Sequence, residues 1–219
     1  MRVYFVRHGQ TVSNKKQVHQ GHDDALNDLG KQQARAVATR FRELPIDIVI
    51  SSDYSRAHDT ANEIAREAGV EVGTTDLLRE RKRPSSLIGK SYMSEEVVRV
   101  MRELEENRHA PDWHHSDEEN HTDALLRAKR FLRFLEGRTE ENIVVVTHAA
   151  FMRFILTSMI FGEQATVEHF KQIYDAFRLA NTGVSVCHYK DGLRGMYHQE
   201  TFWHVDTWND HAHLKDIQE

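Results

Sequence analysis

The chain has 219 residues, of which 39% are hydrophobic and 29% charged, and its formal net charge is −5. This composition excludes a disordered chain and is typical of one sizeable α/β domain. The negative charge argues against nucleic acid as a partner, and no apolar run approaches the ~20 residues of a membrane-spanning helix, so we expect no membrane partner.

In chain order, three short apolar runs are typical of strands that are buried on both faces of a parallel sheet. They are Arg2–Val6, Ile46–Ile50 and Ile143–Val146. Because strand-like sequence starts at residue 2, we expect no signal peptide.

Helical patterns separate these strands, with apolar side chains recurring on one face. The predicted helices are Asp28–Leu44, Ser55–Ala68 with Gly69 as its stop, a helix N-capped by Thr122 and ended by Gly137, and about Ala149 to Phe161, closed by Gly162. Alternating strands and helices predict βαβ units with right-handed crossovers.

The pattern changes near the C-terminus, where two alternating runs predict an antiparallel hairpin. Val184–Tyr189 and Leu193–His198 flank Lys190-Asp191-Gly192, and Asp-Gly is a hairpin turn signal. Cys187, the single cysteine, alternates within the first run and should be a core thiol. One cysteine excludes an internal disulfide and favours a reducing compartment, so we expect a cytoplasmic protein.

Residues 82–121 show no strand pattern and are predicted to form a lid or insertion over one end of the sheet. The segment contains a predicted helix, Ser94–Asn107, and a polar loop, HAPDWHHSDEENH. We therefore predict a single domain over residues 1–219. Its fold class is α/β, a three-layer α/β/α sandwich with a mostly parallel central sheet, a helical insertion over the carboxyl ends of the strands and a late antiparallel hairpin.

Polar side chains follow each predicted parallel strand. The first strand runs into Arg7-His8-Gly9, the second into Ser51-Ser52 with Arg56 one turn into the next helix, and the third into Thr147-His148. Ligands of open α/β sheets bind beyond the carboxyl ends of the strands, so these two arginines and two histidines are expected to converge. Guanidinium forks match phosphate oxygens, and the helix after His148 would add N–H donors.

This cluster suits phosphoryl transfer as well as binding. A neutral imidazole is a nucleophile, and neighbouring arginines favour the neutral form. They would also neutralise charge on the oxygens during transfer. Glu80 is the candidate that protonates the leaving group. Arg81, Lys82 and Arg83 either hold a second anionic group of the substrate or form a solvated basic stretch.

The histidine-rich loop invites a metal site, but no ligand spacing supports one, and a polar loop is preferred. The residues in question are His109, His114, His115 and His121, with Asp112, Asp117, Glu118 and Glu119 nearby. We therefore predict no metal site and no cofactor.

Taken in order along nearly the whole chain, these motifs resemble the histidine phosphatase superfamily, which includes the cofactor-dependent phosphoglycerate mutases. The matching residues are Arg7-His8-Gly9, Thr11, Asn14, Gln20-Gly21, Leu26-(x)3-Gly30-(x)2-Gln33-Ala34, Ser51-Ser52-(x)3-Arg56-Ala57-(x)2-Thr60-Ala61, Leu78-Arg79-Glu80-Arg81, Glu119-(x)3-Asp123-(x)3-Arg127, Val144–His148 and Asn209-Asp210-(x)2-His213-Leu214.

The resemblance implies that His8 is the phosphorylated nucleophile and that Glu80 is the acid/base. It implies a phosphate pocket of Arg7, Arg56 and His148, with Asn14 as a supporting contact, and no metal for this step. The further substrate-binding candidates are Thr11, Gln20, Gly21, Arg81 and the backbone N–H of Ala149.

The sequence departs from the family pattern at two places. Ala149-Ala150 follows His148 where the family usually has glycine. After Glu80, where the phosphatases often show a glycine and a second acidic residue, the sequence is Lys82-Arg83-Pro84-Ser85-Ser86-Leu87-Ile88-Gly89. The insertion is short for a mutase, so a hydrolase acting on a small-molecule phosphate ester is favoured. A mutase and a phosphate-ester or phosphoprotein binding module with little turnover are the alternatives. The natural substrate and the oligomeric state, including a homodimer, are left open.

Overall fold

A six-stranded sheet forms the centre of the computed structural model, which describes residues 1–190 and 202–217. The strand order is β3-β2-β4-β1-β5-β6, and the strands are β1 Arg2–Arg7, β2 Ile48–Ser52, β3 Val72–Thr75, β4 Asn142–Thr147, β5 Val184–Lys190 and β6 Phe202–Asp210. The first four strands pair in parallel, whereas β5 and β6 are antiparallel.

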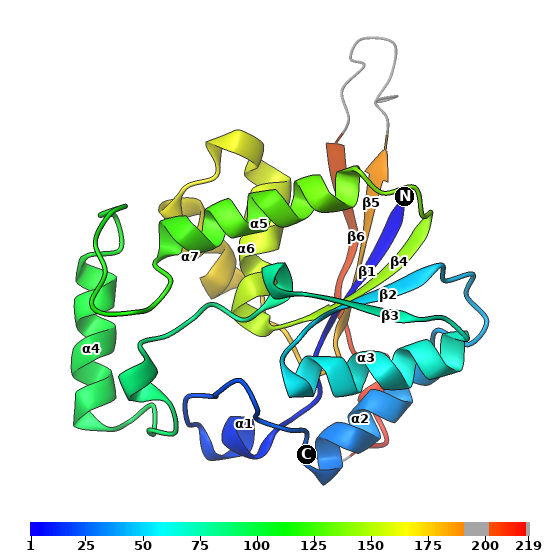
Figure 1. The fold of residues 1–219 in the computed structure, drawn as a ribbon, viewed down its shortest axis with the longest axis horizontal. Coiled ribbons are helices and arrows are strands. Elements are labelled where there is room, and N and C mark those ends of the chain that lie inside the picture. The colour runs from blue at the N-terminus through cyan, green and yellow to red at the C-terminus, as the bar shows by residue number, and fades with distance from the viewer. Residues whose placement is uncertain (191–201, 218–219) are drawn as a thin grey trace.

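Helices cover both faces of this sheet, as Figure 1 shows. On one face lie α2 Asp28–Thr39 and α3 Ser55–Ala68; on the other lie α5 His121–Glu136 and α6 Ala149–Phe161, with α7 Val167–Ala176 beside α6. The predicted α/β sandwich, with a mostly parallel sheet and a late antiparallel pair, is confirmed.

The central strands have no polar face because each packs on both layers. Along β1, Val3 and Phe5 join the core under α5 and α6, while Tyr4 and Val6 join the core under α2 and α3. All four are nearly inaccessible to solvent. This two-sided burial explains why the strands read as continuous apolar runs in the sequence.

Two helix boundaries differ from the prediction. Helix α2 ends at Thr39 rather than Leu44, because the chain turns through residues 40–44 ahead of Pro45, which disfavours a helical residue before it. Helix α5 is capped by Asn120 and not by Thr122. Asn120 forms a capping box with Asp123, each side chain accepting from the other residue's N–H.

Four strands and α-helices were not predicted from the sequence: β3, α7, β6 and α1, which covers Val12–Lys16. Strand β3, with the sequence VGTT, is a short edge strand, and α7 and β6 lie in the C-terminal third. Strand β5 pairs with β6, whose register sets Lys190 opposite Phe202. The strand predicted at Leu193–His198, with the turn before it, lies outside the described residues. Strand β2 begins and ends two residues later than predicted, so Ser51 and Ser52 belong to the strand.

The segment 82–121 carries α4, Glu95–Glu106, which is one residue shorter at each end than the predicted helix and is N-capped by Ser94. Its buried residues form a separate small cluster with Leu87. Figure 1 shows α4 apart from the sheet, beyond α1 (Val12–Lys16). That the segment 82–121 acts as a lid remains a prediction. No helix within residues 1–190 and 202–217 is long and apolar enough to cross a membrane.

Candidate active site

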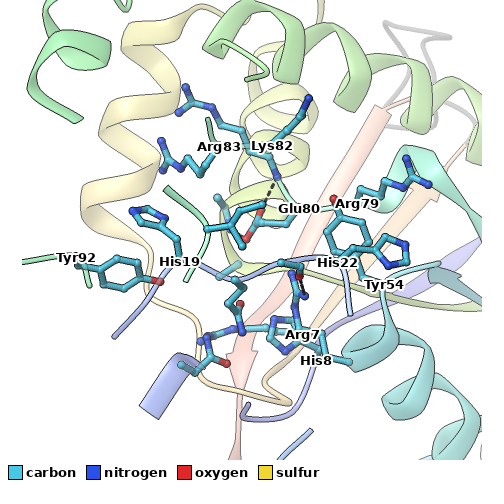
Figure 2. Close-up of a pocket in the computed structure, with 18 of the residues that line it drawn as sticks. Arg7, His8, His19, His22, Tyr54, Arg79, Glu80, Lys82, Arg83 and Tyr92 are labelled. Atoms are coloured by element: carbon cyan, nitrogen blue, oxygen red, sulfur yellow. Dashed lines mark hydrogen bonds between the residues drawn. The ribbon is translucent and has the colours of Figure 1, made fainter. Parts of the chain in front are cut away.

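The carboxyl ends of the parallel strands bring the predicted residues together. Arg7 of β1 lies opposite Thr147 of β4, and the His8 N–H donates to the Thr147 carbonyl at 3.0 Å. The ring centroids of His8 and His148 are therefore only 5.1 Å apart. A cavity of about 640 Å³ opens above them and is lined by Arg7, His8, Arg56 and Glu80 among other residues (Figure 2).

His8 is held with one ring nitrogen free. Its Nδ1 lies 2.7 Å from the Gly9 carbonyl oxygen. A carbonyl only accepts, so Nδ1 carries the hydrogen and Nε2 keeps its lone pair. Burial, followed by the charges of Arg56 and Arg7, holds the pKa of His8 well below its usual range. At neutral pH the imidazole is uncharged and able to act as a nucleophile.

Arg7 and Arg56 bring positive charge, and no carboxylate among the described residues forms an ion pair with either of them. Arg7 donates through Nη1 to the Leu179 carbonyl at 2.7 Å, and Arg56 donates through Nη1 to the Gly21 carbonyl at 2.8 Å. The Nε of each is buried without a partner in the described chain. Burial lowers the pKa of Arg7 to about 10, so it stays charged at neutral pH. Two such guanidiniums form a site for an anion.

His148 lies behind the cavity wall and is fully buried. Its Nε2 is 3.0 Å from the Ser52 hydroxyl, and its Nδ1 has no partner in the described residues. Burial and the Arg56 charge lower the pKa of His148 well below its usual range. Ser52 ends β2, so the predicted meeting of three strand ends is present in the structure.

Glu80 occupies the N-terminus of α6. Its Oε1 accepts from the Phe151 N–H at 2.9 Å and its Oε2 from the Ala150 N–H at 3.1 Å. We expected these N–H groups to face a bound phosphate, but they bind the carboxylate instead. The Ala149 N–H makes no hydrogen bond within the described residues and remains available.

The segment that carries Glu80 is fixed by Arg127 of α5. Arg127 donates to the carbonyls of Leu77 and Arg79, both at 2.8 Å, and forms a two-pronged pair with Glu119. The Thr147 hydroxyl adds a bond to the Leu78 carbonyl at 2.6 Å. These contacts give the Glu119 and Arg127 motif a positioning function that spacing alone did not reveal.

The N-terminal substrate-binding candidates divide between the cavity and its support. Asn14, Gln20 and Gly21 line the cavity. Thr11 is fully buried and does not line it; the Thr11 hydroxyl caps α1 by accepting from the Asn14 N–H, and it also accepts from Gln20. Thr11 therefore positions Asn14 and Gln20.

The basic stretch after Glu80 is heterogeneous. Arg81 lines the cavity but is buried, and it donates to the Glu119 carbonyl and to His121 Nε2, both at 2.9 Å. Lys82 pairs with Asp117 at 2.9 Å. Arg83 is half-buried and has no hydrogen bond or ion pair in the described part of the chain.

Several cavity-lining residues escaped the sequence analysis. Tyr54 packs its ring against His148, at 5.3 Å, and under the Arg56 guanidinium, at 5.0 Å. Its position two residues before Arg56 was an available signal. Others include His19, His22, Arg79, Tyr92, Arg153 and Tyr174. These six come from loops and from α6 and α7, where no spacing pointed to the site.

The C-terminal tail supports the end of β1 through residues 179–183. Asn181 donates to the His8 carbonyl at 2.9 Å. Asn209 at the end of β6 accepts from the Ala180 N–H at 2.8 Å, and His213 Nε2 lies 3.0 Å from the Thr182 hydroxyl. The tail therefore fixes the segment whose Leu179 carbonyl holds Arg7.

In the described parts of the chain, no group of three or more His, Cys, Asp or Glu residues could hold a metal ion. The loop histidines have other contacts: His114 pairs with Asp123 at 2.8 Å and His115 with Glu103 at 3.2 Å.

Comparisons with known proteins agree with this geometry. Residues 3–201 match the family model of the histidine phosphatase superfamily, branch 1. Phosphoglycerate mutase-like protein 4 of Arabidopsis thaliana is 33% identical over 221 residues, covering 98% of this chain and 87% of the relative. The probable phosphoglycerate mutase GpmB of Escherichia coli is 28% identical over 227 residues, covering 98% and 95%. A mycobacterial glucosyl-3-phosphoglycerate phosphatase structure aligns with a TM-score of 0.74 at 22% identity, covering 95% and 98%.

Proposed function

The chain belongs to the histidine phosphatase superfamily, and from this premise we propose that it hydrolyses phosphate monoesters through a phosphohistidine on His8. The observation that carries the proposal is the neutral His8 ring beside two guanidiniums without carboxylate partners, in one cavity with Glu80. A nucleophile, an anion site and a proton carrier are the three parts that phosphoryl transfer to histidine needs.

In the first step, the lone pair of His8 Nε2 attacks phosphorus and the bond from phosphorus to the ester oxygen breaks. The departing oxygen takes a proton from Glu80. Arg7 and Arg56 bind the non-bridging oxygens, and His148 donates a hydrogen bond or closes the pocket behind them. Charge that spreads over these oxygens in the transition state is thereby stabilised.

In the second step, water attacks the phosphohistidine. Glu80, now a carboxylate, takes the proton from that water, and the P–N bond breaks to release phosphate and neutral His8. Every proton and electron pair is thus accounted for by the residues of the cavity. The chemistry draws on no metal and no cofactor.

The test is hydrolysis of an aryl phosphate, with EDTA present, by the wild type and by His8→Ala. The variant should lose roughly 10³-fold or more in kcat, as when an enzyme loses its nucleophile. EDTA should leave the wild-type rate unchanged. A His8→Ala variant with full activity would contradict the mechanism.

A phosphoglycerate mutase is the second candidate, because two of the relatives carry that name. A mutase should depend strongly on a bisphosphate primer and isomerise its substrate faster than it hydrolyses it. Hydrolysis without primer dependence would eliminate this candidate.

We also propose that the protein is cytoplasmic. Cys187 is the single cysteine of the sequence and is a free thiol, which favours a reducing compartment.

A further inference from the structure

A second chamber adjoins the cavity that contains His8. It has a volume of about 210 Å³ and lies between α4 and α7. We call it the distal chamber and the cavity above His8 the main chamber. The residues that line both are Arg81, Arg83, Met101, Ala150 and Tyr174.

The distal chamber offers an apolar surface. Leu104, Val167 and Phe170 line it and are nearly buried. Away from the end that it shares with the main chamber, where Arg81 and Arg83 lie, its charged side chains pair with one another: Arg108 with Glu105, and Lys171 with Asp175 at 3.1 Å. Because the charges of these four side chains are neutralised locally, this part of the chamber suits an uncharged, apolar group.

Arg83 lies where the two chambers meet. The neighbouring cations are already engaged: Arg79 with Asp53, Lys82 with Asp117 and Arg81 with His121. Arg83 is half-buried and makes no such contact within the described residues. Figure 2 shows Arg83 and Lys82 on one side of Glu80, with Arg7 and His8 on the other. Arg83 is therefore an anion site separate from the phosphate pocket.

The size of the main chamber points to a long substrate. At about 640 Å³ it falls within the range of pockets that enclose drug-sized ligands. A compact phosphorylated acid would fill a small part of it and would not reach the distal chamber. Tyr92, Ile88 and Val97 line the main chamber and add apolar surface along its length.

We propose that the substrate is an elongated phosphate monoester that bears a second acidic group and an apolar body. The ester lies at His8, the acidic group at Arg83 and the apolar body in the distal chamber. This inference rests on the proposed phosphatase function and assigns its substrate class.

Matched esters test it. We would measure kcat/KM for phosphate release from N-acetyl and N-octanoyl O-phosphoserine, and from the two phosphoethanolamine amides with the same acyl groups, all below micelle-forming concentrations. The serine and ethanolamine series differ only in the carboxylate. We expect the carboxylate and the longer acyl chain each to raise kcat/KM about ten-fold or more.

Two variants locate these preferences, and a third, Lys82→Gln, is the control for Arg83→Gln. Arg83→Gln should remove the preference for the carboxylate and keep the preference for chain length, whereas Lys82→Gln, which also loses one charge, should keep both. Val167→Trp fills the distal chamber and should remove the chain-length preference. Thermal unfolding checks that each variant is folded. The two preferences themselves are measured on the wild type and do not depend on any variant.

Absence of either preference in the wild type overturns the inference. If phenyl phosphate is still hydrolysed in that case, the proposed phosphatase function stands. If no ester is hydrolysed, both the proposed function and the inference fall. Equal carboxylate preference in wild type and Arg83→Gln would overturn the assignment of Arg83.

Discussion

At the scale of single residues, the proposed chemistry depends on the charge state of His8. Its ring is buried next to Arg56 and Arg7, and both burial and the two positive charges oppose protonation. The same guanidiniums that would bind the phosphate therefore also keep the nucleophile neutral. One arrangement serves both functions, and no separate base is needed to activate the imidazole.

Glu80→Gln tests the proton donor. Gln keeps one oxygen, which can accept from one of the two α6 N–H groups, but it has no acidic proton to deliver to the leaving group. An alkyl phosphate has a poor leaving group, so kcat should fall roughly 10²–10⁴-fold. For 4-nitrophenyl phosphate, whose leaving group needs little protonation, the fall in the first step should be much smaller.

The measurement is kcat for both esters, with pre-steady-state release of 4-nitrophenol to isolate the first step. Equal losses for both leaving groups would contradict the assignment of Glu80 as the acid.

Motif spacing predicted the centre of the candidate site, and the structure brings Arg7, His8, Arg56, Glu80 and His148 together as expected. It did not predict that Glu80 would bind the N-terminus of α6, because that contact joins residues about 70 positions apart. Arg153 was missed since its place in the cavity depends on the packing of α6 rather than on a local pattern.

At the scale of elements, the start of α2 packs directly on the loop after β1. A Cβ added to Gly30 would lie 2.0 Å from the Gln10 carbonyl oxygen, and one added to Gly9 would lie 2.5 Å from the Gly30 carbonyl oxygen. The two backbone segments are therefore in direct contact beside His8, and neither can move to make room for a side chain without a cost in stability.

Gly30→Ala should lower the free energy of unfolding by about 1–3 kcal/mol or more, because the added methyl group overpacks this contact. Gly73→Ala is the matched control, since the nearest atom to its new Cβ would be 4.0 Å away. We expect the control to change stability by less than about 0.5 kcal/mol. Urea unfolding measures both. If Gly30→Ala is stabilising, as helix propensity alone predicts, the packing account is wrong.

The C-terminal tail is a second element whose packing positions His8. Asn209 has a φ of 56° and accepts from the Ala180 N–H, next to the Asn181 side chain that contacts the His8 carbonyl. Asn209→Ala removes the acceptor and strains the backbone, so kcat/KM should fall about ten-fold and stability by about 1–3 kcal/mol.

Asn209→Asp keeps the acceptor and should keep most of the activity, whereas Asn209→Gly relieves the backbone but not the lost bond. If Gly restores kcat/KM as well as Asp does, the hydrogen bond has no part in positioning His8.

The element pattern was predictable where burial is two-sided or periodic. Helices α3 and α6 have the predicted bounds because glycine follows each, and α3 also has a clear apolar stripe. Strand β3 was missed because an edge strand needs little apolar surface, and β6 because long-range pairing with β5 decides it.

At the scale of the whole molecule, one buried and two half-buried histidines make stability depend on pH. Burial, reinforced by nearby arginines, lowers the pKa of His121 to about 3 and those of His19 and His213 to about 4. In the unfolded chain these groups titrate near 6.5, so between these values the unfolded state binds more protons. The stabilisation is present above about pH 6.5 and is lost as the pH falls toward 4.

We therefore expect the free energy of unfolding to decrease steadily from pH 7 to pH 4.5 in urea titrations. His121→Gln retains an acceptor for Arg81 and removes one titrating group, so its stability should fall less steeply over this range. A stability that stays constant, or rises, as the medium becomes more acidic would contradict the buried, neutral state of these rings.

Rapid quenching tests most directly whether the phosphoryl group is transferred to His8. Wild-type protein mixed with a ³²P-labelled phosphate monoester and quenched in base within milliseconds should carry label on a peptide containing His8, with the acid lability of a phosphoramidate. The label should decay at the rate of phosphate release. Label on His148, or single-turnover hydrolysis with no labelled protein at any time, would contradict the account.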